Sequence, residues 1–199
     1  MYYDDLDDDE KVRQVDEERE QRYQEGYYLD ETVDYCKEVL ESIGFSDINI
    51  RYSGFSSQGD GLSFTAKYSN VKRITKVVVD LTTSPDILDL TRKLMELQQS
   101  KRYRLIAEIT AHRRWGNYVH ENTVDIATSL QDWDEIDHVT YDFEWQENEA
   151  FTEIVKGLSQ TFYKMLEDEY NHYVSDEGII EYFRECEIEF EKTERIVRK

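Results

Sequence analysis

Four side chains of this sequence are of the types that acid–base catalysis or metal binding uses: His112, His120, Glu121 and Asp60. An imidazole beside a carboxylate can move a proton or hold a divalent metal ion. Their spacing matches none of the short catalytic signatures, such as HExxH or Gly-x-Ser-x-Gly. Histidines with polar neighbours are more often hydrogen-bonded surface residues. The sequence therefore predicts no catalytic residue, no metal site and no cofactor, and it favours a protein that is not an enzyme.

The most distinctive local pattern is a loop that concentrates three glycines and several hydrogen-bonding side chains between two expected strands. Such a loop can direct backbone N–H groups at a phosphate or another anion, although the GxxxxGK[ST] and GxGxxG spacings are absent. The alternative is structural: the glycines serve turn geometry and the polar side chains satisfy the loop backbone. Both interpretations concern the same residues: Ser53, Gly54, Phe55, Ser56, Ser57, Gln58, Gly59, Asp60 and Gly61.

Charge is the second strong feature, because the formal net charge of -21 on 199 residues is unevenly distributed. Residues 1–50 hold 17 acidic and 5 basic side chains, residues 51–120 hold 6 and 12, and residues 121–194 hold 22 and 4. Long stretches of one sign attract oppositely charged partners. Direct binding to nucleic acid or to an anionic membrane is disfavoured. The basic middle could form a nucleotide- or phosphate-binding patch, but pairing with the protein's own acidic segments is the favoured interpretation.

The segment around 132–153 is expected to carry the acidic binding surface. Alternate residues of a strand lie about 6.6 Å apart, which is comparable to the spacing of phosphates along one DNA strand, with its rise of about 3.4 Å per nucleotide. Carboxylates on a rigid sheet and helix can thus imitate a row of phosphates. The candidate partner-binding residues are Asp132, Asp134, Glu135, Asp137, Asp142, Glu144, Glu147, Glu149 and Glu153.

The first residues, MYYDDLDDDE, are acidic, whereas a signal peptide begins with positive charge and continues into an apolar stretch. The longest apolar run, Val77 to Val79, is far shorter than a membrane helix requires. Cys36 and Cys186 are distant in sequence and belong to no zinc-type cluster. We therefore expect a reduced cytoplasmic protein with no membrane contact.

Hydrophobic periodicity predicts an α+β fold, with an antiparallel-rich sheet of about five to six strands packed against helices. Residues 1–28 have too few aliphatic positions for a burying face, so we predict an acidic tail or a weakly docked helix. Residues 29–199 are predicted to form a single domain. Its expected helices cover 30–43, 85–97, 151–170 and 175–183, and its expected strands cover 48–52, 62–68, 74–81, 103–110, 118–126 and 139–145.

Four segments carry a resemblance to a known group of proteins: SGFSSQGDGLSF at 53–64, GNYVHENTVDI at 116–126, LEDEY at 166–170 and SDEGII at 175–180. They resemble a family of small phage and prophage proteins that share an SGFxSQGDG strand–loop–strand motif and are sometimes labelled antitoxin-like. The resemblance spans roughly residues 30–190 and leaves the acidic leader uncovered. It implies a phage setting, a host-cell cytoplasmic location and an inhibitory role, and it supplies no catalytic residue.

The leading hypothesis is a non-catalytic phage inhibitor, acting against a host defence or as an antitoxin. Its acidic surface would bind and block a basic host protein, for example one that binds nucleic acid. The alternative is a nucleotide- or phosphate-binding module, or a small enzyme, centred on Ser53–Phe64. A third interpretation is a scaffold protein that dimerises through its aromatic-rich helices, which light scattering would reveal.

Overall fold

The computed structural model describes residues 1–25, 29–55, 57–69, 81–99, 104–112, 119–131, 140–142 and 145–190. Their contacts divide the chain into two compact units. Unit 1 consists of Met1–Leu29 with Glu167–Lys199, and unit 2 consists of Asp30–Leu166. Each unit is described separately below.

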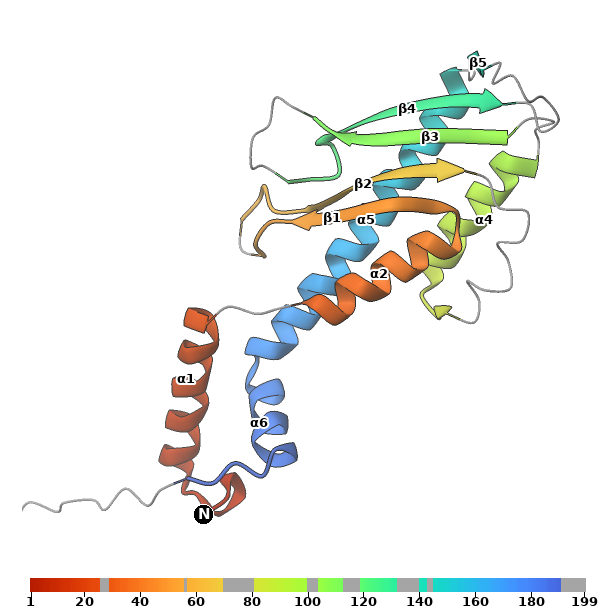
Figure 1. Ribbon diagram of the computed structural model, residues 1–199. Helices are drawn as coiled ribbons and strands as arrows, with labels where there is room; N and C mark the ends of the chain where they lie inside the picture. The colour runs from red at the N-terminus through yellow and green to blue at the C-terminus, as the bar shows by residue number, and fades with distance from the viewer. Residues whose placement is uncertain are drawn as a thin grey trace, which may run out of the picture. The chain divides into compact units, whose positions relative to one another are not determined.

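Unit 2 contains an antiparallel sheet whose strands follow one another in chain order, β1-β2-β3-β4-β5 (Figure 1). The register pairs Phe45 with Tyr68, Ile109 with Ile126, and Ser129 with Asp142. Every strand neighbours the next one in sequence, and the connection between β2 and β3 contains the helix α4. The strands are β1 (Phe45–Tyr52), β2 (Leu62–Ser69), β3 (Arg104–Ala111), β4 (Val124–Gln131) and β5 (Thr140–Asp142).

Three helices of unit 2 cover one face of this sheet, as Figure 1 shows: α2 (Asp30–Ser42), α4 (Pro85–Gln99) and α5 (Trp145–Val174), which continues beyond unit 2. Alternate residues of β2 point into the core, where Phe64 and Tyr68 are almost fully buried. The Phe151 ring of α5 lies 5.1 Å from that of Tyr68. Burial raises the pKa of the Tyr68 phenol. The core of unit 2 is therefore an aromatic-rich layer between sheet and helices.

The sequence pattern of α2 accounts for its position and its end. Cys36, Val39, Leu40 and Ile43 recur at helical spacing and are all fully buried. Gly44 has a φ of 109°, the left-handed backbone that ends many helices and that glycine adopts without strain. The predicted helix over 30–43 is confirmed, as is the buried stripe of the predicted helix over 151–170.

Unit 1 combines the two ends of the chain: the 3₁₀ turn η1 (Tyr3–Asp5), α1 (Asp8–Glu25), the last part of α5 and α6 (Asp176–Glu185). Its small core consists of Tyr3, Leu6, Val15, Ile179 and Phe183. The Ser175 hydroxyl caps α6 by accepting from the Gly178 N–H at 3.0 Å. The end of α5 and α6 group with residues 1–29, while the remainder of the predicted domain 29–199 is unit 2.

The predicted α+β class is confirmed. The described sheet has four strands of eight residues and the three-residue β5, slightly fewer full-length strands than the five to six predicted. The strand expected over 118–126 begins later, at Val124, because residues 121–123 turn. Of the strand expected over 139–145, residues 140–142 form β5 and Trp145 begins α5, while residues 139, 143 and 144 lie outside the described residues. The strand expected over 74–81 lies almost wholly outside the described residues.

Candidate functional site

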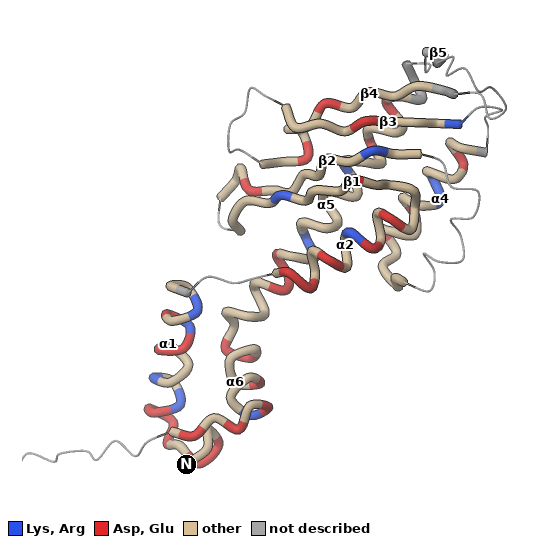
Figure 2. The backbone as a smooth tube through the Cα atoms, in the orientation of Figure 1, with Lys and Arg blue, Asp and Glu red and all other residues tan. Residues whose placement is uncertain are grey.

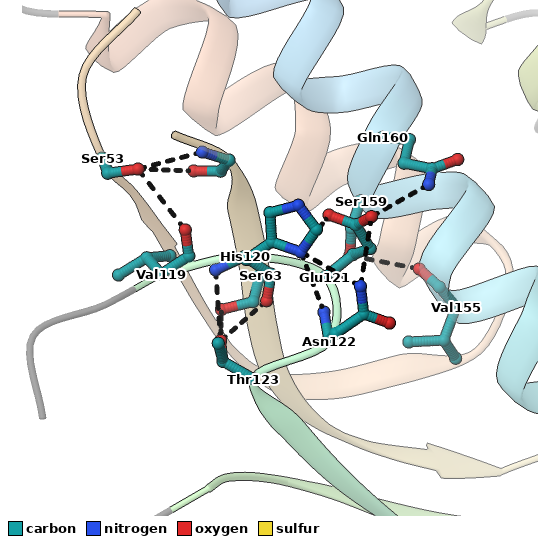
Figure 3. A network of polar contacts seen from close by, with 11 residues as sticks. Ser53, Ser63, Val119, His120, Glu121, Asn122, Thr123, Val155, Ser159 and Gln160 are labelled. Carbon is teal, nitrogen blue, oxygen red and sulfur yellow. Dashed lines mark hydrogen bonds and ion pairs between the residues drawn. The ribbon is translucent and has the colours of Figure 1, made fainter. Parts of the chain in front are cut away.

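Two segments that are distant in sequence meet at one end of the sheet of unit 2. The loop between β1 and β2 and the turn before β4 both lie there, with α5 beside them (Figures 1 and 3). The Ser53 hydroxyl of the first segment lies 3.4 Å from the carbonyl oxygen of Val119 in the second. These segments carry two of the stretches on which the family resemblance rests, SGFSSQGDG and GNYVHENT. We define the polar cluster as Ser53, Ser63, His120, Glu121, Asn122, Thr123 and Gln160.

Ser53 closes the β1–β2 loop at its base. The Ser53 hydroxyl accepts a hydrogen bond from the Gly61 N–H at 2.9 Å. The Ser53 backbone N–H donates to the Gly61 carbonyl at 3.0 Å. The same oxygen can donate to the Val119 carbonyl, so one side chain links the loop to the neighbouring turn. This position therefore requires a short hydroxyl side chain.

Asp60 organises the tip of the loop. Its carboxylate oxygen Oδ2 accepts from the Ser57 N–H at 2.7 Å, and its backbone N–H donates to the Ser57 carbonyl at 3.0 Å. This reciprocal pattern is the way aspartate stabilises tight turns. Asp60 thus uses its carboxylate within the loop, as the structural interpretation of the motif predicted.

Phe55 attaches the loop to α5 through aromatic stacking. Its ring lies nearly parallel to those of Tyr52 and Tyr163, with centroid distances of 5.9 Å and 5.7 Å. The Tyr163 hydroxyl also donates to the Gly54 carbonyl at 3.0 Å. Offset stacks of this kind add about 0.5–1.5 kcal/mol to the burial of the rings. The loop is consequently fixed at its base, at its tip and against the helix.

Gly61 is required because the turn before β4 lies directly against it. A Cβ atom at this position would lie 3.0 Å from Cδ2 and 3.1 Å from Cα of His120. The second distance involves backbone, which cannot rotate away. The glycine therefore allows the close approach of the two segments, and its φ is not in the left-handed region.

His120 and Glu121 form a carboxylate–imidazole contact at the centre of the polar cluster (Figure 3). His120 Nδ1 lies 2.7 Å from Glu121 Oε2, and the other carboxylate oxygen accepts from the Gln160 side chain of α5 at 3.0 Å. The Asn122 side-chain nitrogen also lies 3.2 Å from His120 Nδ1. The Asn122 backbone N–H lies 3.4 Å from the same ring nitrogen, so Nδ1 either donates to Glu121 or accepts from Asn122, but not both at once.

Buried hydroxyls lie next to the His120–Glu121 contact. Thr123 Oγ1 donates to the His120 carbonyl at 2.7 Å and accepts from the His120 N–H at 3.2 Å, which closes the turn. The buried Ser63 hydroxyl of β2 lies 3.5 Å from Thr123 Oγ1. The Ser159 hydroxyl donates to the Val155 carbonyl within α5. These groups satisfy local backbone, which is the expected condition for buried polar atoms.

The arrangement ties two loops to one helix, and a carboxylate–imidazole pair is its only ion pair among the residues drawn in Figure 3. His112, the other histidine that sequence singled out, pairs with Asp125 at 3.1 Å instead. No group of three or more metal-ligating His, Cys, Asp or Glu side chains occurs in the part of the chain that the structure describes. Gln160 was missed in the sequence because it lies on α5, 39 positions from its partner Glu121.

Comparison with known proteins identifies a family and nothing more specific. The family described as "Domain of unknown function (DUF8835)" matches residues 28–176, three quarters of the chain. The chain belongs to this family. The matched segment includes all of unit 2 and the whole polar cluster, whereas α1 and nearly all of α6 lie outside it. No curated protein and no solved structure matches the chain.

The acidic residues that sequence assigned to partner binding are only partly described. Asp132, Asp134, Glu135, Asp137 and Glu144 lie outside the described residues, as does Ser56 of the loop. Asp142 belongs to β5 and Glu147 to the first turns of α5. Glu149 and Glu153 are exposed on α5, one helical turn apart within the DUF8835 segment.

A second acidic surface, on α2, was not singled out by the sequence analysis. Glu31, Asp34, Glu38 and Glu41 are all exposed and follow one another at helical spacings of 3, 4 and 3 residues. Figure 2 shows acidic positions along α2. We call these four residues the α2 acidic line. A helical periodicity of charged residues in the sequence would have identified this exposed face.

The described basic side chains are largely paired at short range. Lys93 of α4 contacts Asp89 at 2.8 Å, and hydrogen bonding from Lys93 lowers the pKa of that carboxyl. Lys37 contacts Asp34 at 2.7 Å within α2, and Lys67 contacts Asp47 at 2.7 Å. Exposed pairs like these stabilise little. They do neutralise the cations locally and leave the excess negative charge unbalanced.

Proposed function

We propose that this protein is a non-catalytic inhibitor whose acidic surface binds and blocks a basic host protein, in the phage setting that its sequence resemblance implies. The observation that carries the proposal is the α2 acidic line, four exposed carboxylates on a helix whose opposite face is fully buried. Such a helix is held rigidly by its core packing. Carboxylates at fixed positions can match the positions of basic groups on a partner. A flexible acidic tail attracts a basic partner but does not match its charges at defined positions.

The dimensions of the α2 acidic line support a partner that binds nucleic acid. From Glu31 to Glu41 a helix rises about 15 Å, so four carboxylates follow at intervals of about 5 Å. The phosphates of a single DNA strand follow at about 3.4 Å along the axis. A protein surface built to contact several successive phosphates would therefore meet a comparable row of negative charge.

The contacts of the β1–β2 loop do not favour the alternative function, a nucleotide or phosphate module. An anion-binding loop needs donors directed outward, yet the Ser57 N–H and the Gly61 N–H are used within the loop by Asp60 and Ser53. We assign the loop a positioning role. The alternative predicts that Asp60→Ala or Gln58→Ala abolishes activity while charge changes elsewhere have little effect.

The first experiment identifies the partner by affinity capture from host lysate and mass spectrometry, and measures its affinity for the purified protein. Binding through acidic residues should weaken steeply between low salt and several hundred millimolar, because screening shortens from about 30 Å at 0.01 M to about 8 Å at 0.15 M. An affinity that does not change with salt would contradict the proposal.

Charge position is then separated from net charge by two matched triple variants. Glu31→Gln, Glu38→Gln and Glu41→Gln neutralise the α2 acidic line, while Asp8→Asn, Glu177→Gln and Glu185→Gln neutralise three exposed carboxylates of unit 1. The first set should weaken binding at least tenfold more than the second. Equal losses would mean that only net charge matters, and the α2 surface would be rejected.

A further inference from the structure

A hollow of about 360 Å³ lies in unit 1, where the first residues of the chain meet the end of α6 (Figure 1). The Phe190 N–H donates to the Met1 carbonyl at 2.8 Å, so a backbone hydrogen bond joins the start of the chain to the segment after α6. The hollow shares no lining residue with the polar cluster or with the α2 acidic line. We call it the Tyr2 hollow, and its lining residues are Tyr2, Tyr3, Asp4, Phe183, Arg184 and Glu187.

Aromatic side chains form the walls of the Tyr2 hollow. Tyr3 and Phe183 belong to the small core of unit 1, where both are buried, and their ring centroids lie 5.5 Å apart. Tyr2 differs, because it is 48% exposed and no ring of the described ranges stacks on it. The hollow thus combines a fixed apolar base with one exposed ring that can cover an occupant.

The charges that line the hollow do not cancel. Arg184 donates from Nη2 to Oδ1 of Asp4 at 2.8 Å, and its Nε lies 3.2 Å and 3.3 Å from the two carboxylate oxygens. The Glu187 carboxylate has no hydrogen bond or ion pair with another side chain within the part of the chain that the structure describes. The nearby Glu189 accepts a long hydrogen bond, 3.5 Å, from the Tyr2 hydroxyl. The remaining charge is therefore negative and attracts a cation.

The end of α6 holds Glu187 in a defined backbone conformation. The Ile188 N–H donates to the Phe183 carbonyl at 3.0 Å, and the Glu187 N–H donates to the Arg184 carbonyl at 3.3 Å. This pair of hydrogen bonds requires a left-handed residue, and Glu187 has a φ of 49°. Glycine adopts that conformation without strain. A glycine would therefore end the helix with less strain, but it would bring no carboxylate to the hollow.

Unit 1 already binds one guanidinium in an environment of this kind. The Arg22 guanidinium lies over the rings of Tyr173 and Tyr182, at 4.2 Å and 4.8 Å from their centroids, and its Nε donates to Glu18 at 2.8 Å. A planar guanidinium stacks on aromatic rings and pairs with carboxylates, whereas an ammonium group is a strongly hydrated point charge. The Tyr2 hollow offers the same combination of ring and carboxylate, and its lining cation is already paired.

We propose that the Tyr2 hollow binds a guanidinium group carried by a partner chain, with the Glu187 carboxylate as counter-ion and the Tyr2 ring stacked on it. This inference deepens the proposed function and rests on it in one respect, that the partner is a basic protein. The volume of about 360 Å³ lies within the usual range of ligand sites, about 300–1,000 Å³. The DUF8835 segment covers residues 28–176, so the hollow is a second contact outside that segment.

The test titrates the ¹⁵N-labelled full-length protein with Nα-acetyl-arginine amide, whose only charge is its guanidinium. Saturable shifts are expected at the backbone amides of Tyr2, Glu187 and Ile188. Nα-acetyl-citrulline amide has nearly the same shape without the charge and should cause no such shifts. The lysine counterpart should bind about fivefold more weakly, because it lacks the planar stacking surface. Equal shifts with arginine and citrulline, no saturable shift with arginine, or tighter binding of lysine would overturn the proposal.

Two substitutions of Glu187 separate binding from folding. Glu187→Gln removes the charge but keeps the side-chain length, and it should weaken binding of the arginine probe about tenfold. Glu187→Gly should weaken binding as much without lowering the melting temperature, because it relieves the left-handed strain. Glu185→Gln removes an exposed carboxylate of α6 that does not line the hollow, so it should leave binding unchanged. Wild-type binding by Glu187→Gln, or an equal loss in Glu185→Gln, would show that the counter-ion is assigned wrongly.

The source of the guanidinium is tested with the blocked peptide Gly-Gly-Arg-Gly-Gly. This peptide should bind at least as tightly as the single amino acid if the site accepts a chain, and weaker binding would indicate a small-molecule site instead. Neutralising the α2 acidic line should leave binding of the arginine probe unchanged. A salt-insensitive host partner together with normal arginine binding would reject the proposed function alone. A salt-sensitive partner together with no arginine binding would reject this inference alone.

Discussion

At the residue scale, Glu121 is the side chain that joins the most parts of the polar cluster. Its two carboxylate oxygens contact His120 and Gln160, which belong to the turn before β4 and to α5. Its side chain is only 12% exposed, so solvent cannot readily replace these partners. The cluster therefore depends on this carboxylate more than on the histidine that first suggests catalysis.

We expect Glu121→Ala to lower the free energy of unfolding by about 1–3 kcal/mol, because two partners lose a partly buried acceptor. Glu121→Gln should cost less, since an amide oxygen can still accept from Gln160. Urea denaturation measures both values. Glu153→Ala, an exposed position on α5, serves as the control and should stay within about 0.5 kcal/mol. Equal effects of the Ala and Gln variants would contradict the role of Gln160.

The glycines of the β1–β2 loop offer a matched comparison. Gly61→Ala would place a Cβ 3.1 Å from the His120 backbone, whereas Gly54→Ala would place one 3.4 Å from an Asp60 carboxylate oxygen, an ordinary contact. We expect a loss of about 1–3 kcal/mol for the first variant, as for other forms of overpacking, and little change for the second. Hydrogen exchange of residues 53–61 and 119–123 should accelerate only in Gly61→Ala.

The sequence identified the β1–β2 loop as a distinctive polar, glycine-rich segment, but it did not predict which residues from other elements complete the polar cluster. Ser53, Asp60 and the glycines interact within a few residues, so turn chemistry predicted their role. The partnership of Glu121 with Gln160 depends on how α5 packs across the sheet. That packing is set by tertiary contacts of Phe151 and its neighbours, which local patterns do not encode.

At the scale of elements, α1 shows how a helix with few aliphatic residues can still dock. The Arg22 side chain is 5% exposed and lies between the rings of Tyr173 and Tyr182, at 4.2 Å and 4.8 Å from their centroids. It also donates to Glu18 at 2.8 Å and to the Tyr173 carbonyl. A count of aliphatic residues alone does not detect this contact, which explains why the sequence predicted only an acidic tail or a weakly docked helix.

We expect Arg22→Ala to loosen unit 1, because it leaves Glu18 and two tyrosines without their partner; breaking a buried pair costs about 3–5 kcal/mol. Arg22→Lys should recover only part of this, since an ammonium lacks the planar stacking surface. Limited proteolysis within α1 and hydrogen exchange of α6 report the effect. Arg13→Ala, with a side chain 44% exposed, is the control. Unchanged protection of α1 in Arg22→Ala would contradict the role of this contact.

At the scale of the whole molecule, the chain combines a DUF8835 segment with a unit made from its two ends. Asp4 and Arg184 help to join those ends, with Oδ1 and Nη2 at 2.8 Å. The hydrogen bond from Arg184 lowers the pKa of the Asp4 carboxyl below its usual 3.8. A lowered pKa in the folded state means stability that is present above pH 3.8 and is lost as pH falls through the folded value.

The wild-type protein should therefore unfold unit 1 at a higher denaturant concentration than Asp4→Asn near neutral pH. The difference should shrink as the pH falls below 3.8 and vanish once Asp4 is protonated in the folded protein. The near-ultraviolet signal of Tyr3 and its neighbours follows this transition. Because the pair is exposed, the difference is small. A difference that grows in acid would contradict the assignment.

None of the described helices is long and apolar enough to cross a bilayer. The α+β class and the principal helices followed from periodicity. The grouping of residues 1–29 with 167–199 did not, because it depends on contacts between distant parts of the chain. Sequence patterns report which residues will be buried, and they do not report which segment will bury them.

The origin of unit 1 in both chain ends has a consequence for biosynthesis. The partners of α1, in α6 and the end of α5, are synthesised more than a hundred residues after it. Translation proceeds at about 5–20 residues per second, so α1 is synthesised on the order of 10 s before the segments that it packs against. Its eight acidic side chains and sparse aliphatic content keep the waiting segment hydrated. The same acidic, aliphatic-poor composition that makes α1 difficult to predict as a docked helix thus keeps it solvated until its partner segments are synthesised.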